Sequence, residues 1–432
     1  MKLYFFVSSL LILFFSCTNT EDKIITNEIN INGNVYSASR PNILLLIADD
    51  LGIEATPGFL NQYPSLLKAN MSVLDSLRQH GISFVNHWST PVCSPTRATL
   101  LTGKYGYHTG VFDAGDHIST SELSLQQLMK ENNAGYATAI FGKWHLTSDY
   151  SDPQLMGIDH FAGIAGGAVN NYYDWELLYN GDSTEDITEY ITSKLTDLAI
   201  DWISEQNKPW FVWMGYNAPH TPFHDPPSDL HTVSDLSTEI GQFFAAAEAL
   251  DTEMGRLIRS IPQEELDNTI ILYVGDNGSP SGVSQIFTNA KGTIWQGGIN
   301  TPVVVSGAGV SRIGETDSSL INSTDFFATI ADLAGTGIDT LNNSVSFKSL
   351  LTNEGSSRRT YVYAEKPGTN NKTGYTIRNS SLKYMYTGTS NSRVYNLLND
   401  PLEQNGIKGQ LNDDQIQDTL ELYNILHNII RQ

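Results

Sequence analysis

The chain has 432 residues, of which 40% are hydrophobic, and a formal net charge of −22. This length and composition predict a folded globular protein, with one large α/β domain and a small appendage or with two ordinary domains. The negative charge excludes nucleic acid as an expected partner, because phosphates would be repelled. An anionic ligand would need a local basic pocket. Any Lys or Arg near a candidate site is therefore a stronger candidate for binding that ligand.

The N-terminal residues predict export. Lys2 precedes an apolar run, Leu3–Phe15, that is too short to span a bilayer but suits a signal-peptide core. The run leads to Cys17 in a pattern similar to a bacterial lipoprotein signal, where the Cys becomes the lipidated first residue. We therefore expect a lipoprotein-type signal peptide over 1–17, a polar tether over 18–38, and a membrane-anchored protein in the periplasm or on the cell surface. The alternative is an ordinary signal peptide in which Cys17 stands by chance.

Cys17 and Cys93 are the two cysteines of the chain. If Cys17 carries a lipid, Cys93 has no partner, whereas exported proteins normally pair their cysteines or avoid them. Cys93 could be a small buried hydrophobic residue, as free Cys often is. Its sequence neighbours favour a chemical role instead.

Continuous apolar runs predict buried strands of a parallel sheet, because strands covered on both faces do not alternate. Helical spacing of apolar residues predicts helices between these strands. The alternation predicts an α/β catalytic domain over 39–335, with helices on both faces of its sheet. The expected strands are Asn42–Ala48, Tyr136–Phe141, Trp210–Gly215, Thr269–Gly275 and Pro302–Ser306, and the expected helices are Ser72–His80, Leu123–Asn132, Ile187–Glu205 and Ser237–Ile261.

After about Gly335 the pattern changes to short, Tyr-rich segments separated by Asn, Ser, Thr and Gly. Such segments predict a small antiparallel sheet, which a helix then follows to the C-terminus. We expect this C-terminal subdomain over 336–432. Its predicted strands are Thr360–Ala364, Gly374–Arg378, Leu382–Tyr386 and Arg393–Leu397, and its predicted helix is Leu411–Ile430.

Polar and charged residues follow four of the expected strands. In open α/β sheets, ligands bind beyond the carboxyl ends of the strands. Lys143 and His145 alternate with Trp144, so both would point the same way in an extended segment. The sequence thus predicts that one sheet edge gathers Asp49-Asp50, Lys143 with His145, His220, and Asp276-Asn277.

The segment Cys93-Ser94-Pro95-Thr96-Arg97 predicts a reactive group at the start of a helix. Pro95 fits the first turn, where its missing N–H costs nothing, and Gly103 can end the helix. Cys93 would then face the partial positive charge of the helix N-terminus, which favours anions. Arg97 lies one turn further on the same face, an arrangement that suits an anionic ester.

This segment, followed by Leu101-Thr102-Gly103-Lys104, is similar to the signature of the type I sulfatases of the alkaline phosphatase superfamily. The resemblance implies the family's fold: a large, mostly parallel sheet sandwiched by helices, with a small C-terminal antiparallel sheet and helix. It runs from about Arg40 to Gln404. The segments that carry it are Asn42–Gly52, Cys93–Gly110, Gly142–Leu146, Ala218–Phe223, Asp276–Gly278, Lys291–Gly298 and parts of Val394–Gln404.

Oxygen donors at the predicted sheet edge favour a hard divalent cation over zinc. Taken alone, Asp49-Asp50 after a strand would fit a helix N-cap equally well. The resemblance implies one cation, usually Ca²⁺ with Mg²⁺ possible, held together with a modified Cys93. The implied metal ligands are Asp49, Asp50, Cys93, Asp276 and Asn277.

The resemblance also implies that a maturation enzyme oxidises Cys93 to formylglycine, whose hydrate attacks the sulfur of a sulfate ester. Sulfated polysaccharides or oligosaccharides are the expected substrates. Gln296 departs from the Glu that the family usually has there. The implied roles are activation of the nucleophile by Arg97, binding of the sulfuryl oxygens by Lys143 and Lys291, protonation of the leaving alcohol by His220, and deprotonation of the second hydroxyl by His145.

Two other functions stay open at this point. One is a phosphoester or phosphonate ester hydrolase of the same superfamily, and the other is a catalytically dead glycan-binding lipoprotein. The sugar, the sulfate position and endo or exo action are not readable from the sequence. Several aromatic residues near these segments could stack on sugar rings, although core packing is the more common role: Trp88, Tyr172, Tyr173, Trp175 and Trp295.

Overall fold

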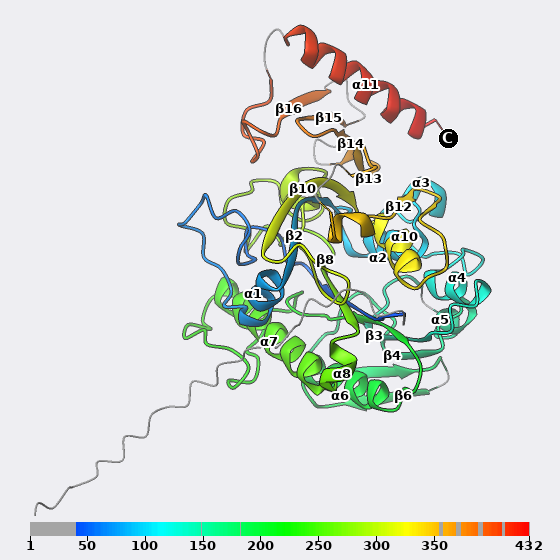
Figure 1. Cartoon of the computed structure of the whole chain (residues 1–432). Helices are drawn as coiled ribbons and strands as arrows, with labels where there is room; N and C mark the ends of the chain where they lie inside the picture. Colours follow the sequence, from blue (N-terminus) through cyan, green and yellow to red (C-terminus); the bar gives the residue numbers. More distant parts are fainter. Residues whose placement is uncertain are drawn as a thin grey trace, which may run out of the picture.

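The computed structural model contains two sheets, each with its own helices (Figure 1). A ten-stranded mixed sheet lies between helices, and a four-stranded antiparallel sheet with helix α11 stacks at one end of it. This arrangement confirms the fold class expected from the sequence. The structure describes residues 40–147, 149–181, 183–353, 357–368, 373–387, 392–407 and 411–431.

The large sheet has its parallel strands at the centre. Its strands are β1 Asn42–Ala48, β2 Gly81–Trp88, β3 Ala137–Lys143, β4 His160–Ile164, β5 Trp175–Tyr179, β6 Ser183–Ile187, β7 Trp210–Gly215, β8 Thr269–Gly275, β9 Val303–Gly307 and β10 Glu315–Asn322. Their order is β10-β2-β9-β8-β1-β7-β3-β4-β5-β6. From β8 to β4 each strand runs parallel to the next, so these carboxyl ends open at one edge.

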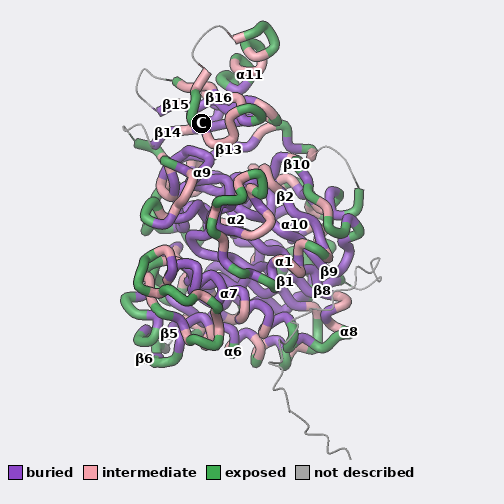
Figure 2. Tube along the Cα trace, turned by 90° about the vertical axis from the view of Figure 1, so that its left-hand side faces the viewer, coloured by how far each residue is buried: buried purple, intermediate pink, exposed green. Residues whose placement is uncertain are grey.

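Both faces of the large sheet are covered, which explains the unbroken apolar runs. Along β1 every residue from Ile43 to Ala48 is 0% exposed. Leu44 and Leu46 pack toward helices α1 (Ser72–Gln79), α6 (Ile191–Ser204) and α7 (Glu239–Ser260). Their neighbours Ile43 and Leu45 pack toward α2 (Cys93–Thr102), α4 (Leu125–Glu131) and α10 (Asp325–Leu333). Figure 2 shows the buried core running through the sheet between the two helical layers.

The other helices of this body are short. They are α3 Gly106–Thr109, α5 Asp152–Leu155, α8 Gln263–Leu266, α9 Gln296–Ile299 and the 3₁₀ helix η1 Lys348–Leu351. A two-stranded ribbon, β11 (Thr340–Leu341) with β12 (Ser344–Val345), lies against α10. Phe347, Leu350 and Leu351 pack into the core on the α2 and α10 side of the large sheet. The domain boundary predicted between 335 and 336 stays a prediction.

The sequence patterns place most of the expected elements to within two residues, but β2, β4, β5, β6 and β10 were not among them. Three strands of the large sheet, β1, β7 and β8, have the expected bounds, as do two C-terminal strands, Gly374–Arg378 and Leu382–Tyr386. Ser124 and Thr238 cap α4 and α7 by accepting a hydrogen bond from the backbone, so these helices begin two residues later than expected. Ile187 was expected to begin a helix but ends β6, where it pairs with Trp175, and α6 begins at Ile191. Strand β9 runs antiparallel to β2 and β8, a direction that no apolar pattern encodes.

The C-terminal body consists of β13 (Val362–Lys366), β14 (Gly374–Arg378), β15 (Leu382–Tyr386), β16 (Arg393–Asn396) and α11 (Asp413–Ile429). All three strand pairs are antiparallel, as the sequence predicts. Its tyrosines and α11 form one apolar cluster. A second cluster joins this body to the large sheet through Trp88, Ile294 and Trp295.

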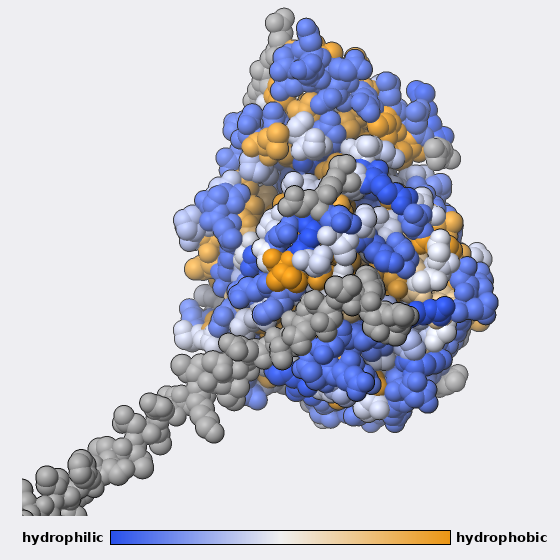
Figure 3. All heavy atoms as spheres, viewed as in Figure 1, coloured by the Kyte–Doolittle hydropathy of each residue, from blue (hydrophilic) through white to orange (hydrophobic). Residues whose placement is uncertain are grey.

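The exterior is mostly hydrophilic on the face that Figure 3 shows, in keeping with the net charge of −22. Among the helices in the described residues, none has the length and apolar character needed to traverse a bilayer. The predicted signal peptide, the tether and Cys17 lie outside the described residues.

Candidate active site

Six charged or amide side chains meet at the carboxyl ends of β1, β3 and β8 and at the start of α2. Asp49 and Asp50 follow β1, Asp276 and Asn277 follow β8, Lys143 ends β3, and Arg97 lies in the second turn of α2. Each of them is at most 1% exposed. Burial of so many charges is costly unless they pair, so their contacts define what the cluster can do.

Cys93 is the first residue of α2, and Gly103 ends this helix with a left-handed φ of 66°. Its Sγ lies 3.3 Å from Asp49 Oδ1 and 3.9 Å from Asp50 Oδ1. Burial and the charge of Asp49 raise the pKa of the Cys93 thiol well above its usual range. An unmodified Cys93 is therefore held as a thiol, the weakly nucleophilic form.

Arg97 ties the helix to the strand ends. Its Nη2 donates to Asp276 Oδ2 at 3.0 Å and to Asp49 Oδ2 at 3.5 Å, and its Nη1 donates to the Lys143 carbonyl at 2.6 Å. Burial opposes the charge of Arg97, but Asp276 and Asp49 outweigh it and raise the pKa of the guanidinium. Arg97 is therefore a fixed positive charge beside Cys93.

Two lysines reach the same carboxylates from other segments. Lys143 Nζ contacts Asp49 Oδ2, and Lys291 Nζ lies 2.5 Å from Asp50 Oδ1. Burial lowers the pKa of each lysine, yet Asp49 beside Lys143 and Asp50 beside Lys291 reverse this and raise both pKa values. Three permanent cations thus surround the thiol of Cys93, as the sequence predicted for an anionic ligand.

The carboxylates differ in their electrostatic setting. Burial raises the pKa of Asp49, but Lys143, His220, Arg97 and Lys291 together bring it well below its usual range. Burial and the nearby charge of Asp49 raise the pKa of Asp276, against the pull of Arg97. Acidic groups packed this closely favour a further positive charge among them.

A metal ion fits one part of this cluster. Ligand atoms of Asp49, Asp50, Cys93 and His220 all lie within 4.8 Å of one another. Asn277 Oδ1 is buried beside them without a hydrogen-bond partner in the described residues, while Asn277 Nδ2 donates to Asp50 Oδ1 at 2.7 Å. An orphaned amide oxygen next to two carboxylates is the donor set that Ca²⁺ or Mg²⁺ prefers.

Two details of that set differ from the predicted ligands. His220 joins the close group, although the sequence assigned it only a proton-transfer role. Both oxygens of Asp276 are already engaged, Oδ1 by the Asp50 N–H at 3.1 Å and Oδ2 by Arg97 at 3.0 Å. Asp276 is also absent from the group of ligand atoms within 4.8 Å of one another, although Asp50, whose oxygens accept from Asn277 Nδ2 and Lys291 Nζ, is engaged as fully.

His220 has a defined tautomer. Its Nδ1 lies 2.7 Å from the Thr221 carbonyl, which only accepts, so Nδ1 carries a hydrogen. Its Nε2 lies 3.7 Å from Asp50 Oδ2. This nitrogen can offer a lone pair to a cation or, when protonated, a hydrogen to an oxygen beside Asp50.

His145 lies near the same charges but its backbone is not extended, contrary to the alternation argument. It adopts a left-handed φ of 57°, and its N–H donates to the Ala165 carbonyl at 3.1 Å. Burial, followed by Lys143 and Arg97, lowers the pKa of His145 to about 3. Its ring is therefore neutral near pH 7 and can accept a hydrogen bond, but the lowered pKa makes it a weak base.

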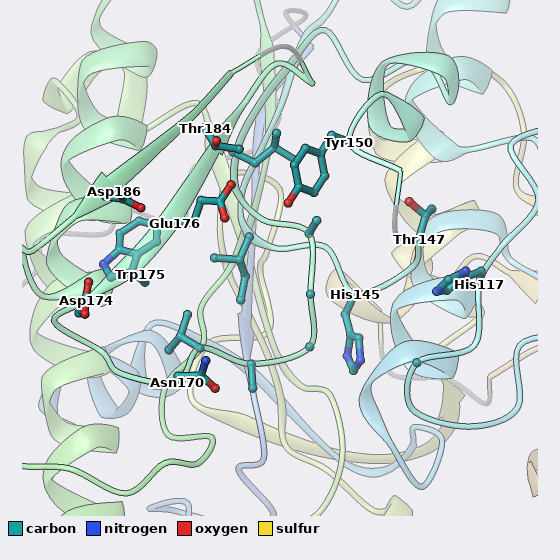
Figure 4. A pocket seen from close by; sticks show the side chains of 18 residues that line it. His117, His145, Thr147, Tyr150, Asn170, Asp174, Trp175, Glu176, Thr184 and Asp186 are labelled. Carbon is teal, nitrogen blue, oxygen red and sulfur yellow. The ribbon is translucent and has the colours of Figure 1, made fainter.

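A cavity of about 680 Å³ opens beside His145 (Figure 4). Its walls come from residues 164–170 at the end of β4 and beyond it, from Asp174, β5 and β6, from Thr147 and Tyr150, and from Gly115 and His117. The sequence reasoning missed this region. The available signal was Ala165-Gly166-Gly167-Ala168, a run of small residues that follows another strand at the same sheet edge.

Of the aromatic residues that the sequence suggested for sugar stacking, most are buried in the core. Trp88, Tyr172 and Trp295 are at most 7% exposed and belong to the core. Trp175 is 5% exposed and contributes to the cavity wall, whereas Tyr173 is 36% exposed. Tyr150, which the sequence reasoning did not consider, is 43% exposed at the cavity.

Comparison with protein families gives one match, to the family described as sulfatase, over residues 41–336. Among curated proteins, the uncharacterized sulfatase YdeN of Escherichia coli (strain K12) is 29% identical over 359 residues, covering 69% of this chain and 63% of YdeN. The human N-acetylgalactosamine-6-sulfatase is 29% identical over 340 residues, covering 68% of this chain and 62% of its own. The chain thus spans less than two thirds of these relatives.

A longer alignment exists with the ulvan-active sulfatase of Formosa agariphila. It is 25% identical over 451 residues, covering 95% of this chain and 84% of that protein. Among solved structures, Ps i-CgsB in complex with k-i-k-neocarrahexaose has a TM-score of 0.76 at 23% identity, covering 90% of this chain and 92% of that one. A phosphonate monoester hydrolase of Agrobacterium radiobacter has a TM-score of 0.66 at 18% identity, covering 91% and 96%.

The structural likenesses establish a shared fold at this level of identity. The family match shows family membership as well, because it spans more than half of the chain, from Pro41 to Thr336. That range contains Cys93, the strand-end carboxylates and the three cations described above. The chain belongs to the sulfatase family.

Proposed function

We propose that this protein hydrolyses sulfate esters of glycans, with a formylglycine derived from Cys93 and one divalent cation, Ca²⁺ being the expected ion. The observation that carries the proposal is the buried cluster in which Cys93 lies 3.3 Å from Asp49 while Arg97, Lys143 and Lys291 pair with the surrounding carboxylates. Surface ion pairs rarely converge in this way, whereas sites for anionic ligands do.

Charge balance supports an anionic substrate. The carboxylates of Asp49, Asp50 and Asp276 match the charges of Arg97, Lys143 and Lys291 one for one. A divalent cation bound by Asp49, Asp50 and the Asn277 amide oxygen would leave the cluster with net positive charge. Such a site attracts a sulfate ester in spite of the chain's net charge of −22.

The cation and the modified Cys93 would have separate roles. When bound, the cation supplies Lewis-acid polarisation of a sulfate oxygen. Formylglycine, as its hydrate, supplies an attacking hydroxyl and a second hydroxyl whose deprotonation expels sulfate. The raised pKa of the Cys93 thiol argues against direct thiolate chemistry, which supports a modified residue at this position.

The remaining roles follow from the protein's own side chains. Lys143 and Lys291 keep their charge and would bind the sulfuryl oxygens as negative charge builds up on them. Arg97 would orient the attacking group at position 93. His220 Nε2 would donate a proton to the leaving alcohol. His145 would take one from the second hydroxyl once the negative charge of the bound sulfate offsets Lys143 and Arg97, which lower its pKa.

The substrate class and the location belong to the same proposal. Relatives include an ulvan-active sulfatase and N-acetylgalactosamine-6-sulfatases, and a structurally similar protein was solved with a neocarrahexaose. Sulfated polysaccharides or oligosaccharides are accordingly our expected substrates. We also propose export with a lipid anchor on Cys17, and maturation by a formylglycine-generating enzyme of the host.

Peptide mass spectrometry tests the central step. Protein purified from a host with formylglycine-generating activity should carry an aldehyde at position 93 and should release sulfate from 4-methylumbelliferyl sulfate. Chelation with EDTA should abolish the release, and Ca²⁺ should restore it. An active preparation whose Cys93 peptide is an ordinary thiol would refute the mechanism, and a matured protein that binds sulfated glycans without turnover would refute the enzyme.

A phosphonate or phosphate ester hydrolase is the second candidate, because a phosphonate monoester hydrolase shares the fold with a TM-score of 0.66. Parallel assays with an aryl sulfate, an aryl phosphate and an aryl phosphonate separate the two. We expect the highest kcat/KM for the sulfate, because the family match is to sulfatases. A higher kcat/KM for either phosphorus ester would overturn this assignment.

A further inference from the structure

The cavity beside His145 differs in charge from the cluster that it adjoins. The cluster gathers Arg97, Lys143 and Lys291, whereas no Lys or Arg lines the cavity. Three carboxylates line it instead, those of Asp174, Glu176 and Asp186. In Figure 4, Glu176 and Tyr150 reach into the cavity from opposite walls, and Asp186 lies on the neighbouring strand. A ligand that spans both regions would meet positive charge at one end and negative charge at the other.

These carboxylates have no counter-charge in the described residues. Glu176 on β5 pairs directly with Asp186 on β6, so two like charges lie opposite each other across the strands. No ion pair involving Asp174, Glu176 or Asp186 occurs in the part of the chain that the structure describes, and all three are exposed. Directly opposed like charges weaken a strand pair. Stability therefore does not explain why both line a cavity of about 680 Å³.

The cavity is built to receive something bulkier than water. Its volume of about 680 Å³ lies within the roughly 300–1,000 Å³ typical of ligand pockets. A side chain at Gly166 would meet only the Ala168 carbonyl oxygen, at 4.0 Å, so a ligand can approach the backbone there. Tyr150 offers an exposed ring, and Asn170 and Thr184 add polar groups that can bind hydroxyls.

We propose that this cavity holds an uncharged sugar unit of the substrate, and that its three carboxylates exclude glycans with a uronate or a second sulfate at that position. The inference rests on the proposed function, since it assumes that the sulfate ester binds at Cys93. Hydroxyl groups of a neutral sugar can donate hydrogen bonds to Glu176, Asp186 and Asp174. A carboxylate or sulfate in the same place would be repelled, with no Lys or Arg in the cavity lining to pair with it.

A solvated acidic surface is the competing explanation, because the whole chain is strongly acidic. Glu185 allows the two to be separated. It lies on β6 next to Asp186 and is exposed, but it pairs with Leu177 and does not line the cavity. If the acidity matters only as bulk charge, Glu185 and Asp186 should affect substrate choice equally.

The test uses monosulfated disaccharides in matched pairs. The two members of a pair differ only in the sugar next to the sulfated one, which is a neutral hexose in one and the corresponding uronic acid in the other. Sulfate release by the matured full chain is measured for both, with 4-methylumbelliferyl sulfate reporting the chemistry alone. We expect the neutral member to be favoured by roughly tenfold in kcat/KM, as like-charge contact predicts.

The variants then assign the selectivity to the cavity. The double variant E176Q/D186N should bring the neutral-to-uronate ratio of kcat/KM toward one, and E185Q should leave the ratio unchanged. The inference is overturned if uronate members are turned over as well as neutral ones, if the double variant keeps the ratio, or if only the aryl sulfate is hydrolysed. Failure to hydrolyse the aryl sulfate as well would instead refute the proposed function.

Discussion

Opposite charges are buried in two places, the strand-edge cluster around Cys93 and the joint between the large sheet and the C-terminal body. In the cluster, Lys291 Nζ lies 2.5 Å from Asp50 Oδ1. At the joint, Lys383 Nζ lies 2.5 Å from Glu403 Oε1. The two contacts are equal in length, so distance alone does not separate a chemical role from a structural one.

The surroundings of the two pairs differ. Lys383 and Glu403 are at most 1% exposed as side chains, and their other contacts are with backbone and with Trp88. Lys383 donates to the Ile294 carbonyl at 2.9 Å, and the Gln296 N–H donates to Glu403 Oε2 at 2.6 Å. The joint therefore fixes the segment that follows Lys291.

The strand-edge cluster is open and incompletely satisfied. The Lys291 side chain is 21% exposed and that of His220 15%. Asn277 Oδ1 and His145 Nδ1 are buried without partners in the described residues. The two regions therefore differ in access from solvent, which a site prepared for a ligand needs and a pair that locks the fold does not.

The largest expected effect comes from breaking the buried pair at the joint, Lys383 with Glu403. Lys383→Met leaves Glu403 as a buried charge without its partner and should lower the free energy of unfolding by about 3–5 kcal/mol, measured by urea denaturation. Lys348→Met is the control, because Lys348 forms a 3.0 Å pair with Asp332 whose side chains are 32% and 26% exposed. It should cost about 1 kcal/mol or less. Equal losses in the two variants would remove the distinction.

The next effect falls on catalysis. Lys291→Ala removes one positive charge from the open cluster and should lower kcat/KM for an aryl sulfate by roughly a hundredfold to a thousandfold. Lys104→Ala is matched to it in exposure, since the Lys104 side chain is 25% exposed and pairs with Glu122 at 2.6 Å. Thermal unfolding of both variants checks that they fold. A similar kcat/KM in the two variants would argue against a role for Lys291 in the reaction.

Much of the strand-edge cluster was readable in the sequence, and the reason is physical. Strands buried on both faces must be apolar throughout, so β1, β7 and β8 appear as continuous runs. Parallel strands present their carboxyl ends together, so the residues that follow them could be grouped without knowing the strand order. The family resemblance added the metal and formylglycine assignments, which apolar patterns do not contain.

Other features depend on contacts that no local pattern encodes. Strand β2 contains the polar residues Asn86 and His87, which are tolerated because His87 Nδ1 bonds Thr301 Oγ1 at 2.9 Å. Glu403 reads as part of a loop until folding brings it to Gln296, a partner 107 positions away. The cavity beside His145 likewise requires β5 and β6 to be in place.

A smaller effect on catalysis should follow when a single methyl group is added at Gly167. A Cβ at Gly167 would lie 2.2 Å from His145 Nε2, so Gly167→Ala must displace the ring. We expect kcat/KM for an aryl sulfate to fall by about tenfold to a hundredfold, as for a catalytic group that is misplaced by an ångström. Gly166→Ala controls for size, because its Cβ meets only a carbonyl oxygen at 4.0 Å, and it should lower kcat/KM less. The reverse order would mean that His145 does not need its present position.

The smallest expected effect is a difference in pKa between Lys383 and Lys291. Burial outweighs the attraction of Glu403 and lowers the pKa of Lys383 to about 8, whereas Asp50 raises the pKa of Lys291. In the unfolded chain the pKa of a lysine is about 10.4, so the folded protein releases the Lys383 proton first. Between pH 8 and 10 the unfolded state then holds more protons, and this group adds to stability as pH rises.

NMR of ε-¹⁵N-labelled lysines should detect the titration of Lys383 in that range, while Lys291 keeps its proton. The free energy of unfolding, compared between the natural chain and Lys383→Met from pH 8 to pH 10, should show the rise only where Lys383 is present. If Lys383 kept its proton up to pH 10, the Lys383–Glu403 pair would be as fully charged as the Lys291–Asp50 pair. Access to solvent would then be the remaining difference between the two regions.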